Sequence, residues 1–271
     1  MGTERIQKER KQTDMESKRR KAALITGAAK GIGREIAYTL AGEGYDIAVN
    51  YRSDERAAVQ LCREAEGLGV KALPVYGDLS KMEDIRAMFD KVFEVFPVLD
   101  VLVNNAGISS EVSFLEATEE MFDHMTAIDW KGVFFSSQIA AKNMIAHGVQ
   151  GVIVNISSNQ VEGCWPDATI YASTKAAVSK FTRNAAMELS FYGIRMVAVA
   201  PGYTDVGWAP DDKRRKVADK LPLRRFATTR EIAKGVVYLI SQDAAYITGT
   251  ALVIDGGATL PVVAANDFVE D

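Results

Sequence analysis

The sequence has 271 residues, of which 48% are hydrophobic, and its formal net charge is −4. This length and composition permit one large α/β domain with a full core and are unlike those of a disordered chain. The acidic balance gives no general attraction to nucleic acid or anionic membranes, and no apolar run reaches the roughly 18–20 residues that span a bilayer.

The first twenty residues differ from the rest of the chain. They contain seven Lys or Arg and four Asp or Glu residues and almost no apolar ones. Because they lack the apolar stretch of a signal peptide, we expect residues 1–20 to be a charged, flexible extension, with an interaction arm as the alternative. We expect one domain over residues 21–258 and a tail over 259–271, since no repeat or Pro/Gly/Ser-rich linker divides the chain.

Short apolar runs alternate with longer helical patterns through the expected domain. Several runs are rich in Val and Ile and apolar on both faces, as buried parallel strands are. This alternation, with right-handed crossovers, predicts a single doubly wound, Rossmann-type α/β domain, with a seven-stranded parallel sheet and helices on both faces. The predicted strands are 22–26, 46–50, 72–76, 99–103, 151–156, 194–200 and 251–254, and the predicted helices are 31–43, 54–67, 82–95, 118–146, 171–191 and 229–241.

A glycine-rich turn joins the first predicted strand to the first predicted helix. Glycines at 27, 31 and 33 allow the backbone to bend tightly and to approach a pyrophosphate, which then lies at the helix N-terminus. Any tight strand–helix turn favours glycine, so the pattern alone is weak evidence. Its position at the start of the domain predicts a dinucleotide site.

The end of the second predicted strand bears on the choice of dinucleotide. An acidic residue there would bind the ribose 2′-hydroxyl of NAD, but this chain reads Asn50-Tyr51-Arg52-Ser53. Arg52, aided by Lys30 of the glycine turn, suits the 2′-phosphate of NADP. NADP is therefore the preferred cofactor, although Asp54 and Glu55 weaken this argument, NAD remains possible, and Arg52 as a solvated loop residue is the alternative.

Polar or turn-forming residues follow the next strands as well. In an open parallel sheet, ligands bind beyond the carboxyl ends of the strands, so these residues are expected to line one continuous crevice. They are Asp78, Asn104-Asn105, Ser157-Ser158 and Pro201-Gly202.

Three further residues predict the chemistry of that crevice. Tyr171 and Lys175 stand four positions apart in a predicted helix and so share one face. An ammonium ion within about 4–6 Å favours the phenolate form of a phenol, so Lys175 would let Tyr171 exchange a proton with a substrate oxygen. Ser158 at the end of the fifth strand would hydrogen-bond the same oxygen. Each feature alone is common, but together they predict hydride transfer between a nicotinamide and a carbonyl or alcohol carbon.

With these motifs in place, the sequence resembles the short-chain dehydrogenase/reductase family. The resemblance covers about residues 21–258 and rests on 26–33, Asp78, 104–107, Ser158, 171–175, 201–202 and 255–257. It implies that Asp78 contacts the adenine and that the residues after Pro201-Gly202 surround the nicotinamide. It also implies a homotetramer built on the fourth and fifth helices. The implied cofactor-binding residues are Gly27, Lys30, Gly31, Ile32, Gly33, Tyr51, Arg52, Asp78, Leu79, Asn105, Ala106, Gly107, Tyr171, Lys175, Pro201, Gly202 and Thr204.

The chain departs from the family pattern at two positions. Asp129 stands where the family usually has an asparagine that supports a helix kink and a water relay to the lysine. A carboxylate accepts hydrogen bonds but cannot donate like an amide, and it can pair with Lys175, so we expect activity with an altered pH profile and count Asp129 with the catalytic residues. After Pro201-Gly202, Val206 replaces a common threonine, for which Thr204 is the expected substitute.

The substrate side is expected between the fifth strand and the residues after the sixth. Gln160, Cys164 and Trp165 are predicted to wall the pocket, and residues 202–223 are predicted to form a lid that contains Tyr203 and Trp208. Residues 211–230 contain eight Lys or Arg and three Asp or Glu residues, a charge that suits an acidic partner such as a carrier protein. A solvated helix face without a partner is the alternative.

Cysteines and histidines add no further chemistry to this prediction. Cys62 and Cys164 are too few for a disulfide framework and fit a reducing, cytoplasmic compartment. No histidine lies near Cys164 in the sequence, so a nucleophilic role is not expected. His124 and His147 lack metal-ligand spacing, so no metal site is predicted.

The leading functional hypothesis is an NADPH-preferring ketoreductase, with a 3-oxoacyl thioester of a carrier protein or of CoA as the first expected substrate. The resemblance leaves a sugar or polyol dehydrogenase of the glucose dehydrogenase type as the alternative enzyme. A cofactor-sensing protein that has lost catalysis is the alternative of another class. The partners expected are a small carbonyl or alcohol substrate and further copies of the chain, with no nucleic acid and no membrane.

Overall fold

The computed structural model describes residues 19–109, 111–207 and 213–260. Seven strands form one parallel sheet in the order β3-β2-β1-β4-β5-β6-β9, which confirms all seven predicted strands within two residues at either end. The strands are β1 Ala22–Ile25, β2 Asp46–Tyr51, β3 Ala72–Tyr76, β4 Val101–Asn104, β5 Val152–Ile156, β6 Arg195–Pro201 and β9 Ala251–Ile254.

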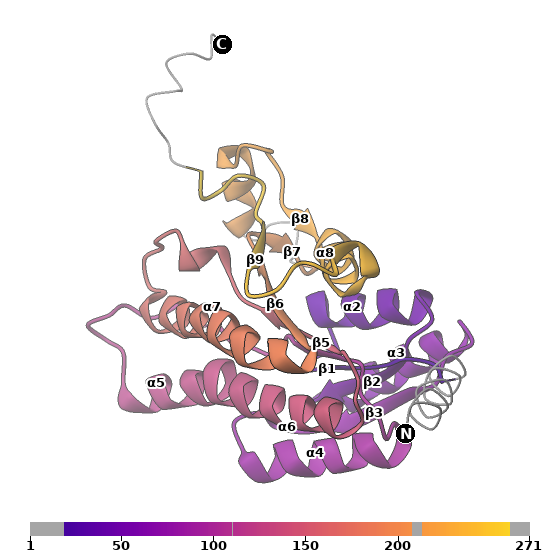
Figure 1. Ribbon diagram of the computed structural model, residues 1–271. Helices are drawn as coiled ribbons and strands as arrows, with labels where there is room; N and C mark the ends of the chain where they lie inside the picture. The colour runs from indigo at the N-terminus through magenta and orange to yellow at the C-terminus, as the bar shows by residue number, and fades with distance from the viewer. Residues whose placement is uncertain (1–18, 110, 208–212, 261–271) are drawn as a thin grey trace, which may run out of the picture.

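Helices cover both faces of the sheet, as a doubly wound fold requires (Figure 1). Successive residues of β1 point to opposite faces: Ala23 and Ile25 pack into one core cluster, and Ala22 and Leu24 pack into the other. The first cluster includes residues of α2 (Gly31–Gly42), α3 (Glu55–Glu66) and α8 (Thr229–Ile240). The second includes residues of α4 (Met82–Val95), α6 (Val133–Ala146) and α7 (Thr169–Leu189).

The single helix predicted over 118–146 is wrong in one respect. The chain forms α5 (Glu119–Thr126), then a π-helical segment η1 (Ala127–Gly132), and then α6. Hydrophobic periodicity does not reveal such a segment, because a π turn changes the phase of the helix by a single residue. Close packing accompanies it: a Cβ on Gly132 would lie 2.8 Å from the Leu79 carbonyl oxygen. The segment places Asp129 in the interior, where its side chain is fully buried.

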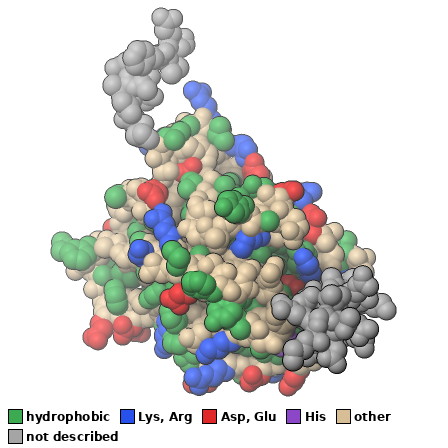
Figure 2. Space-filling model, in the orientation of Figure 1, with side chains coloured by type: hydrophobic (Ala, Val, Ile, Leu, Met, Phe, Trp, Pro, Cys, Tyr) green, Lys and Arg blue, Asp and Glu red, His purple; other side chains and the backbone are tan. Residues whose placement is uncertain are grey.

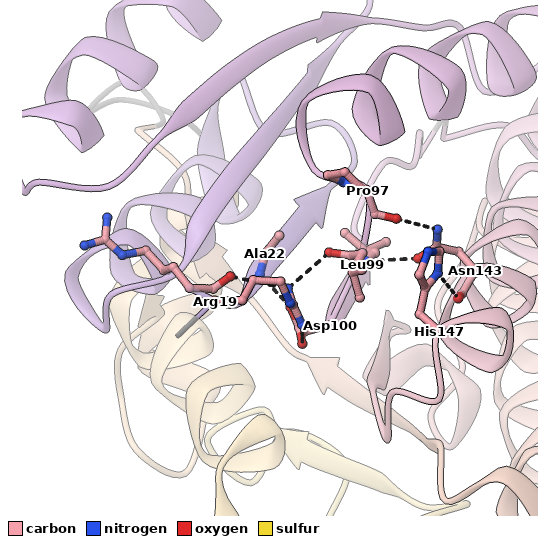
Figure 3. A network of polar contacts seen from close by, with 9 residues as sticks. Arg19, Ala22, Pro97, Leu99, Asp100, Asn143 and His147 are labelled. Carbon is pink, nitrogen blue, oxygen red and sulfur yellow. Dashed lines mark hydrogen bonds and ion pairs between the residues drawn. The ribbon is translucent and has the colours of Figure 1, made fainter. Parts of the chain in front are cut away.

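A polar network holds the amino-terminal ends of the neighbouring strands β1 and β4 (Figure 3). The guanidinium of Arg19 donates two hydrogen bonds to the carboxylate of Asp100, at 2.6 and 2.7 Å, and Asp100 also accepts a bond from the Ala22 N–H. Nearby, Asn143 of α6 accepts from the Leu99 N–H and donates to the Pro97 carbonyl. Arg19, which the sequence analysis assigned to the extension, therefore contacts the domain. Residues 1–18 and 261–271 of the predicted tails lie outside the described residues.

Short strands and 3-10 segments complete the fold. Strand β7 (Thr204–Asp205) pairs in parallel with β8 (Ala227–Thr228), so the two ends of the intervening segment meet. The 3-10 segments are η2 (Asn159–Val161), η3 (Ser190–Tyr192), η4 (Lys213–Lys220) and η5 (Gln242–Ala244). Within the described ranges, no helix has the length and apolar character needed to cross a bilayer.

Candidate active site

The turn between β1 and α2 has the conformation of an anion-binding loop. Gly27 and Gly31 have φ values of +62° and +58°, which L side chains rarely adopt. A Cβ on Gly27 would also lie 2.8 Å from the Ala106 Cα. Lys30, the N-cap of α2, has no side-chain acceptor with which to cap the helix, which leaves its first N–H groups for a ligand. These features fit a dinucleotide pyrophosphate at the N-terminus of α2.

Asn50 at the end of β2 holds this turn from one side. Its side-chain oxygen accepts a hydrogen bond from the Gly27 N–H at 3.0 Å, and its nitrogen donates to the Gly77 carbonyl at 3.1 Å. Asn50 is buried and its bonds are satisfied within the protein, so its side chain is not free to read a ribose. Arg52 and Lys30 are exposed nearby, as a reader of the 2′-phosphate would have to be.

Asp78, which follows β3, remains an ionised carboxylate. Burial raises its pKa, but bonds from the backbone and hydroxyl of Ser80 and the charges of Arg52 and Lys81 lower the pKa below its ordinary value overall. The ends of β2 and β3 thus present one cation and one anion to the predicted adenosine end of the crevice.

Asn105 beyond β4 holds the glycine turn from the other side. Its side-chain nitrogen donates to the carbonyl oxygens of Thr26 at 2.9 Å and Gly27 at 3.1 Å. The Thr26 hydroxyl in turn accepts from the backbone N–H groups of Asn105 and Ala106. The turn is therefore fixed before any ligand binds.

Three of the four predicted catalytic residues lie beyond β5 and on α7. Ser158 is buried, and its hydroxyl caps η2 by accepting a bond from the Gln160 N–H at 3.2 Å. The Lys175 ammonium donates to the Ile156 carbonyl at 3.1 Å and lies 5.5 Å from the centre of the Tyr171 ring. Helix α7 thus presents Tyr171 and Lys175 together, at the strand end that carries Ser158.

Asp129 pairs with Lys175, which confirms the pairing expected from the sequence. The Asp129 Oδ2 lies 3.4 Å from the Lys175 Nζ, and its Oδ1 accepts from the Ile108 N–H at 2.9 Å. Burial raises the pKa of Asp129 above its ordinary value, against the opposing effect of Lys175 and the Ile108 N–H. Burial alone would lower the pKa of Lys175, but the charges of Asp129 and Tyr171 raise it overall.

A cavity of about 340 Å³ connects these residues to the cofactor turn. Cys164, predicted to wall the pocket, is exposed and is not among the lining residues, and Trp208 lies outside the described residues. The other predicted residues that do not line this cavity are Asp129 of η1 and, at the glycine turn and the neighbouring strand ends, Gly27, Lys30, Gly31, Gly33, Tyr51, Arg52, Asp78, Leu79 and Ala106. The cavity brings together Ile32, Asn105, Gly107, Ser158, Gln160, Trp165, Tyr171, Lys175, Pro201, Gly202, Tyr203 and Thr204 of the predicted set.

The sequence analysis missed several lining residues from the segment after β4. Ile108, Ser109 and Glu111 all line the cavity. The motif at 104–107 marks where this segment begins, but no spacing indicates how far it follows the cleft. The same segment projects from the molecule before α5, where hydrophobic side chains gather at the left extremity in Figure 2; Phe114 and Leu115 are 73% and 91% exposed.

The substrate end of the cavity is polar and aromatic. The Trp165 indole donates to the Tyr203 hydroxyl at 3.0 Å, and the Tyr203 ring stacks on Phe226 with 5.5 Å between the ring centres. The side-chain oxygen of Gln160 is buried and makes no hydrogen bond within the described part of the chain. With Glu111 at the rim, this end offers hydrogen-bond acceptors to a ligand.

A second, larger cavity of about 680 Å³ lies between α6 and α7. It shares no lining residue with the first cavity and contains none of the predicted catalytic residues. Its walls are mostly apolar and include the contacting rings of Trp130, Phe134 and Phe181. Ser158, Tyr171 and Lys175 line the smaller cavity and not this one.

Comparison with known proteins agrees with this geometry. The family model described as enoyl-(acyl carrier protein) reductase matches residues 27–259. The chain is 38% identical to the uncharacterized oxidoreductase YohF of Escherichia coli (strain K12), over 88% of this chain and 95% of the relative. It is also 38% identical to the 3-oxoacyl-[acyl-carrier-protein] reductase FabG of Staphylococcus aureus (strain Mu50 / ATCC 700699), over 88% and 97% of the two chains.

Solved structures with the same fold include a dehydrogenase and a ketoreductase. The acetoin dehydrogenase YohF from Salmonella typhimurium superposes with a TM-score of 0.84 at 34% identity, over 89% of this chain and 97% of that one. The angucycline C-6 ketoreductase LanV, solved with bound NADP, superposes with a TM-score of 0.83 at 33% identity, over 89% and 96%.

Proposed function

We propose that this chain, which belongs to the short-chain dehydrogenase/reductase family and is an NAD(P)-dependent ketoreductase, prefers NADPH as its reductant. In the reaction it reduces a ketone to a secondary alcohol. The observation that carries the proposal is the convergence of Ser158, Tyr171 and Lys175 in one cleft beside the glycine turn.

The nicotinamide, when bound, supplies the hydride to the carbonyl carbon. The Tyr171 hydroxyl donates the proton that the carbonyl oxygen needs as it becomes an alcohol. The Ser158 hydroxyl hydrogen-bonds the same oxygen and stabilises the charge that develops there. The Lys175 ammonium keeps a positive charge beside the phenol ring, from a position fixed by the Ile156 carbonyl.

The preference for NADPH rests on the end of β2. Lys30 in the glycine turn and Arg52 after β2 are exposed cations, and Asn50 is occupied with internal bonds. A guanidinium suits a phosphate because it binds it with paired, charge-assisted hydrogen bonds. The related ketoreductase LanV, whose structure contains bound NADP, supports the same choice.

A 3-oxoacyl thioester, carried by a carrier protein or by CoA, is the first candidate substrate. The relative FabG is named as a 3-oxoacyl-[acyl-carrier-protein] reductase. The basic stretch of 211–230 suits an acidic carrier, although Arg225 is paired with Glu231 and the side chains of residues 208–215 are outside the described set.

A small hydroxylated ketone or polyol is the second candidate, and the shape of the cleft favours it. The cavity is modest and is lined at its substrate end by Gln160, Trp165, Tyr203 and the carboxylate of Glu111. The buried, unpaired oxygen of Gln160 would accept a bond from a substrate hydroxyl beside the carbonyl. The related structure named as an acetoin dehydrogenase supports this class of substrate.

Assembly as a homotetramer through the face formed by α6 and α7 is part of the same proposal. The apolar cavity there lies at the surface, and Ile145 and Tyr192 on its rim are 37% and 55% exposed. Light scattering coupled to gel filtration would give the mass of the assembly. A cytoplasmic location is proposed as well, supported by the two free cysteines.

The test of the activity is a screen of cofactor oxidation. The purified protein is mixed with NADPH or NADH and with 3-oxoacyl thioesters, hydroxyketones, sugars and steroid ketones, and the loss of reduced-nicotinamide absorbance is followed. Turnover of one class, abolished in a Tyr171→Phe variant, is the expected result. Tight cofactor binding without turnover of any ketone would instead favour a cofactor-sensing protein.

A further inference from the structure

The ion pair between Asp129 and Lys175 is enclosed by the protein. The two side chains are 0% and 4% exposed. Asp129 belongs to η1 and Lys175 to α7, and the segment after β4 crosses directly over both: a Cβ on Gly107 would lie 3.2 Å from the Asp129 Oδ2 and from the Lys175 Nζ. The pair is therefore a fixed part of the cleft and has little freedom to separate.

The charge of Asp129 has one main partner. Its Oδ1 accepts from the Ile108 N–H, but its Oδ2 is buried and makes no hydrogen bond in the described ranges, so the ammonium at 3.4 Å is what balances it. A buried carboxylate without a counter-charge is unfavourable, because the protein interior solvates it less well than water does. Other titratable groups facing the pair are Tyr171 on α7 and, at longer range, His124 on α5.

The Lys175 ammonium therefore has two acidic neighbours, the Asp129 carboxylate and the Tyr171 phenol. On one side is the buried carboxylate at 3.4 Å, and on the other is the Tyr171 ring, whose centre is 5.5 Å away. Positive charge that is balanced by Asp129 is less effective in stabilising a phenolate at Tyr171. The three groups lie close enough to interact electrostatically, and the carboxylate adds a negative charge beside the ammonium.

We propose that Asp129 is a positioning residue that acts as the internal counterion of Lys175 and so moves the proton loss of the Tyr171–Lys175–Asp129 system to higher pH. This inference rests on the proposed function, since it assigns the pH range of that reaction. Ketone reduction needs the system with its proton, and alcohol oxidation needs it without. Asp129 thus extends reduction to more alkaline pH and confines oxidation to alkaline pH.

The decisive variant is Asp129→Asn. Asparagine keeps an acceptor for the Ile108 N–H and removes the charge, but it places an amide NH2 where Oδ2 faces the ammonium, so a second neutral variant without an amide is needed as well. Because one nearby charge shifts a titration by about 1–3 pH units, the alkaline limb of kcat/KM for reduction should move to lower pH by about one unit or more, and the rising limb for oxidation should move with it. Asp129→Ser, a second neutral variant, should move both limbs in the same direction.

Controls separate charge from packing. Asp90→Asn, an exposed aspartate on α4, removes the same charge far from the cleft and should leave both limbs in place. Circular dichroism and NADPH affinity establish that each variant is folded. A loss of activity without a shift of either limb, or limbs that coincide with those of the unchanged protein, would refute the counterion role, because a purely structural residue changes rates and leaves the midpoints alone.

A second measurement does not need turnover. The ultraviolet absorbance of tyrosinate is titrated for the protein and for Asp129→Asn, and the curve of a matching Tyr171→Phe variant is subtracted from each. The remaining signal should rise at lower pH in Asp129→Asn, and coincident curves would refute the inference. If no ketone or alcohol reacts, the proposed function fails, and this titration still decides the counterion role.

Discussion

The side-chain nitrogen of Asn105 and the Cα of Gly33 are so close that a side chain on Gly33 would overlap the amide. The added Cβ would also lie 2.6 Å from the Gly27 carbonyl oxygen. The same amide holds the Thr26 and Gly27 carbonyls, so the first turn of α2 packs directly on the strand end that supports the cofactor turn. Glycine at position 33 is thus required by packing, with no need for an unusual φ.

Gly33→Ala is therefore expected to displace the cofactor turn. Overpacking at such a site costs about 1–3 kcal/mol, and NADPH affinity should fall because the displaced atoms belong to the site. Thermal unfolding and NADPH fluorescence titration measure the two effects. Gly42→Ala at the other end of α2 is the matched control, since nothing lies within 4 Å of its added Cβ. Equal affinities for the Gly33 and Gly42 variants would contradict this account.

Tyr171→Phe should remove the proton donor and leave the cofactor site intact. Loss of a general acid lowers kcat by about 10²–10⁴-fold, whereas NADPH affinity should stay within about twofold of the unchanged protein. Stopped-flow turnover and fluorescence titration separate the two quantities. Tyr246→Phe changes a tyrosine that is fully exposed and should have no effect on either. Near-normal turnover in Tyr171→Phe would mean that another group donates the proton.

Arg52→Asp should shift the cofactor preference toward NADH. The variant removes a cation suited to the 2′-phosphate and adds a carboxylate suited to a ribose 2′-hydroxyl. A hydrogen bond to a charged group contributes about 1.5–3 kcal/mol, so the ratio of kcat/KM for NADPH over NADH should fall at least about tenfold. Arg86→Asp, exposed on α4, makes the same change of charge elsewhere. A ratio that is the same in both variants would exclude Arg52 as the phosphate reader.

The capping box at the start of α8 should make stability depend on acid pH. Side-chain bonds from Arg225, with those from Thr228, lower the pKa of Glu231 from 4.5 to about 2. The carboxylate therefore binds protons more readily in the unfolded chain, and its stabilising effect is present above about pH 4.5 and is lost as the pH falls toward 2. The pair is exposed, so the effect is small.

Glu231→Gln tests this dependence. The difference in unfolding free energy between the protein and the variant should be largest near neutral pH and should vanish at the acid end of that window. Urea denaturation at a series of pH values provides the measurement. A difference that grows as the pH falls would show that the ionised form of Glu231 does not stabilise the fold.

The sequence predicts the sheet well because its strands are buried on both faces. Continuous apolar runs such as those at 151–156 and 194–200 have few other readings, and turn residues bound them on both sides. Thr169 begins α7 two residues before the predicted start, which is the usual uncertainty of helix ends. The glycine turn and the Tyr171–Lys175 pair were predictable because their chemistry needs particular residues at fixed spacing.

Other parts of the site depend on three-dimensional packing and could not be predicted. The π-helical segment is too short for its periodicity to be recognised in the sequence. The burial of Asp129 therefore becomes visible only in the folded structure, where Gly132 packs against Leu79. The position of Glu111 depends on the path of a loop, and loops follow contacts more than local sequence. Cys164 failed as a pocket residue because nearness to Trp165 in sequence says little about which side chain faces the cavity.

The short pairing of β7 with β8 has a consequence for how such an enzyme can diversify. Because Thr204–Asp205 pairs as a strand with Ala227–Thr228, the segment between them begins and ends at the same place in the fold. Lengthening the segment between these two strands costs little closure entropy. Substrate specificity can therefore change through substitutions and insertions in this segment alone, while the residues that carry out the reaction stay the same.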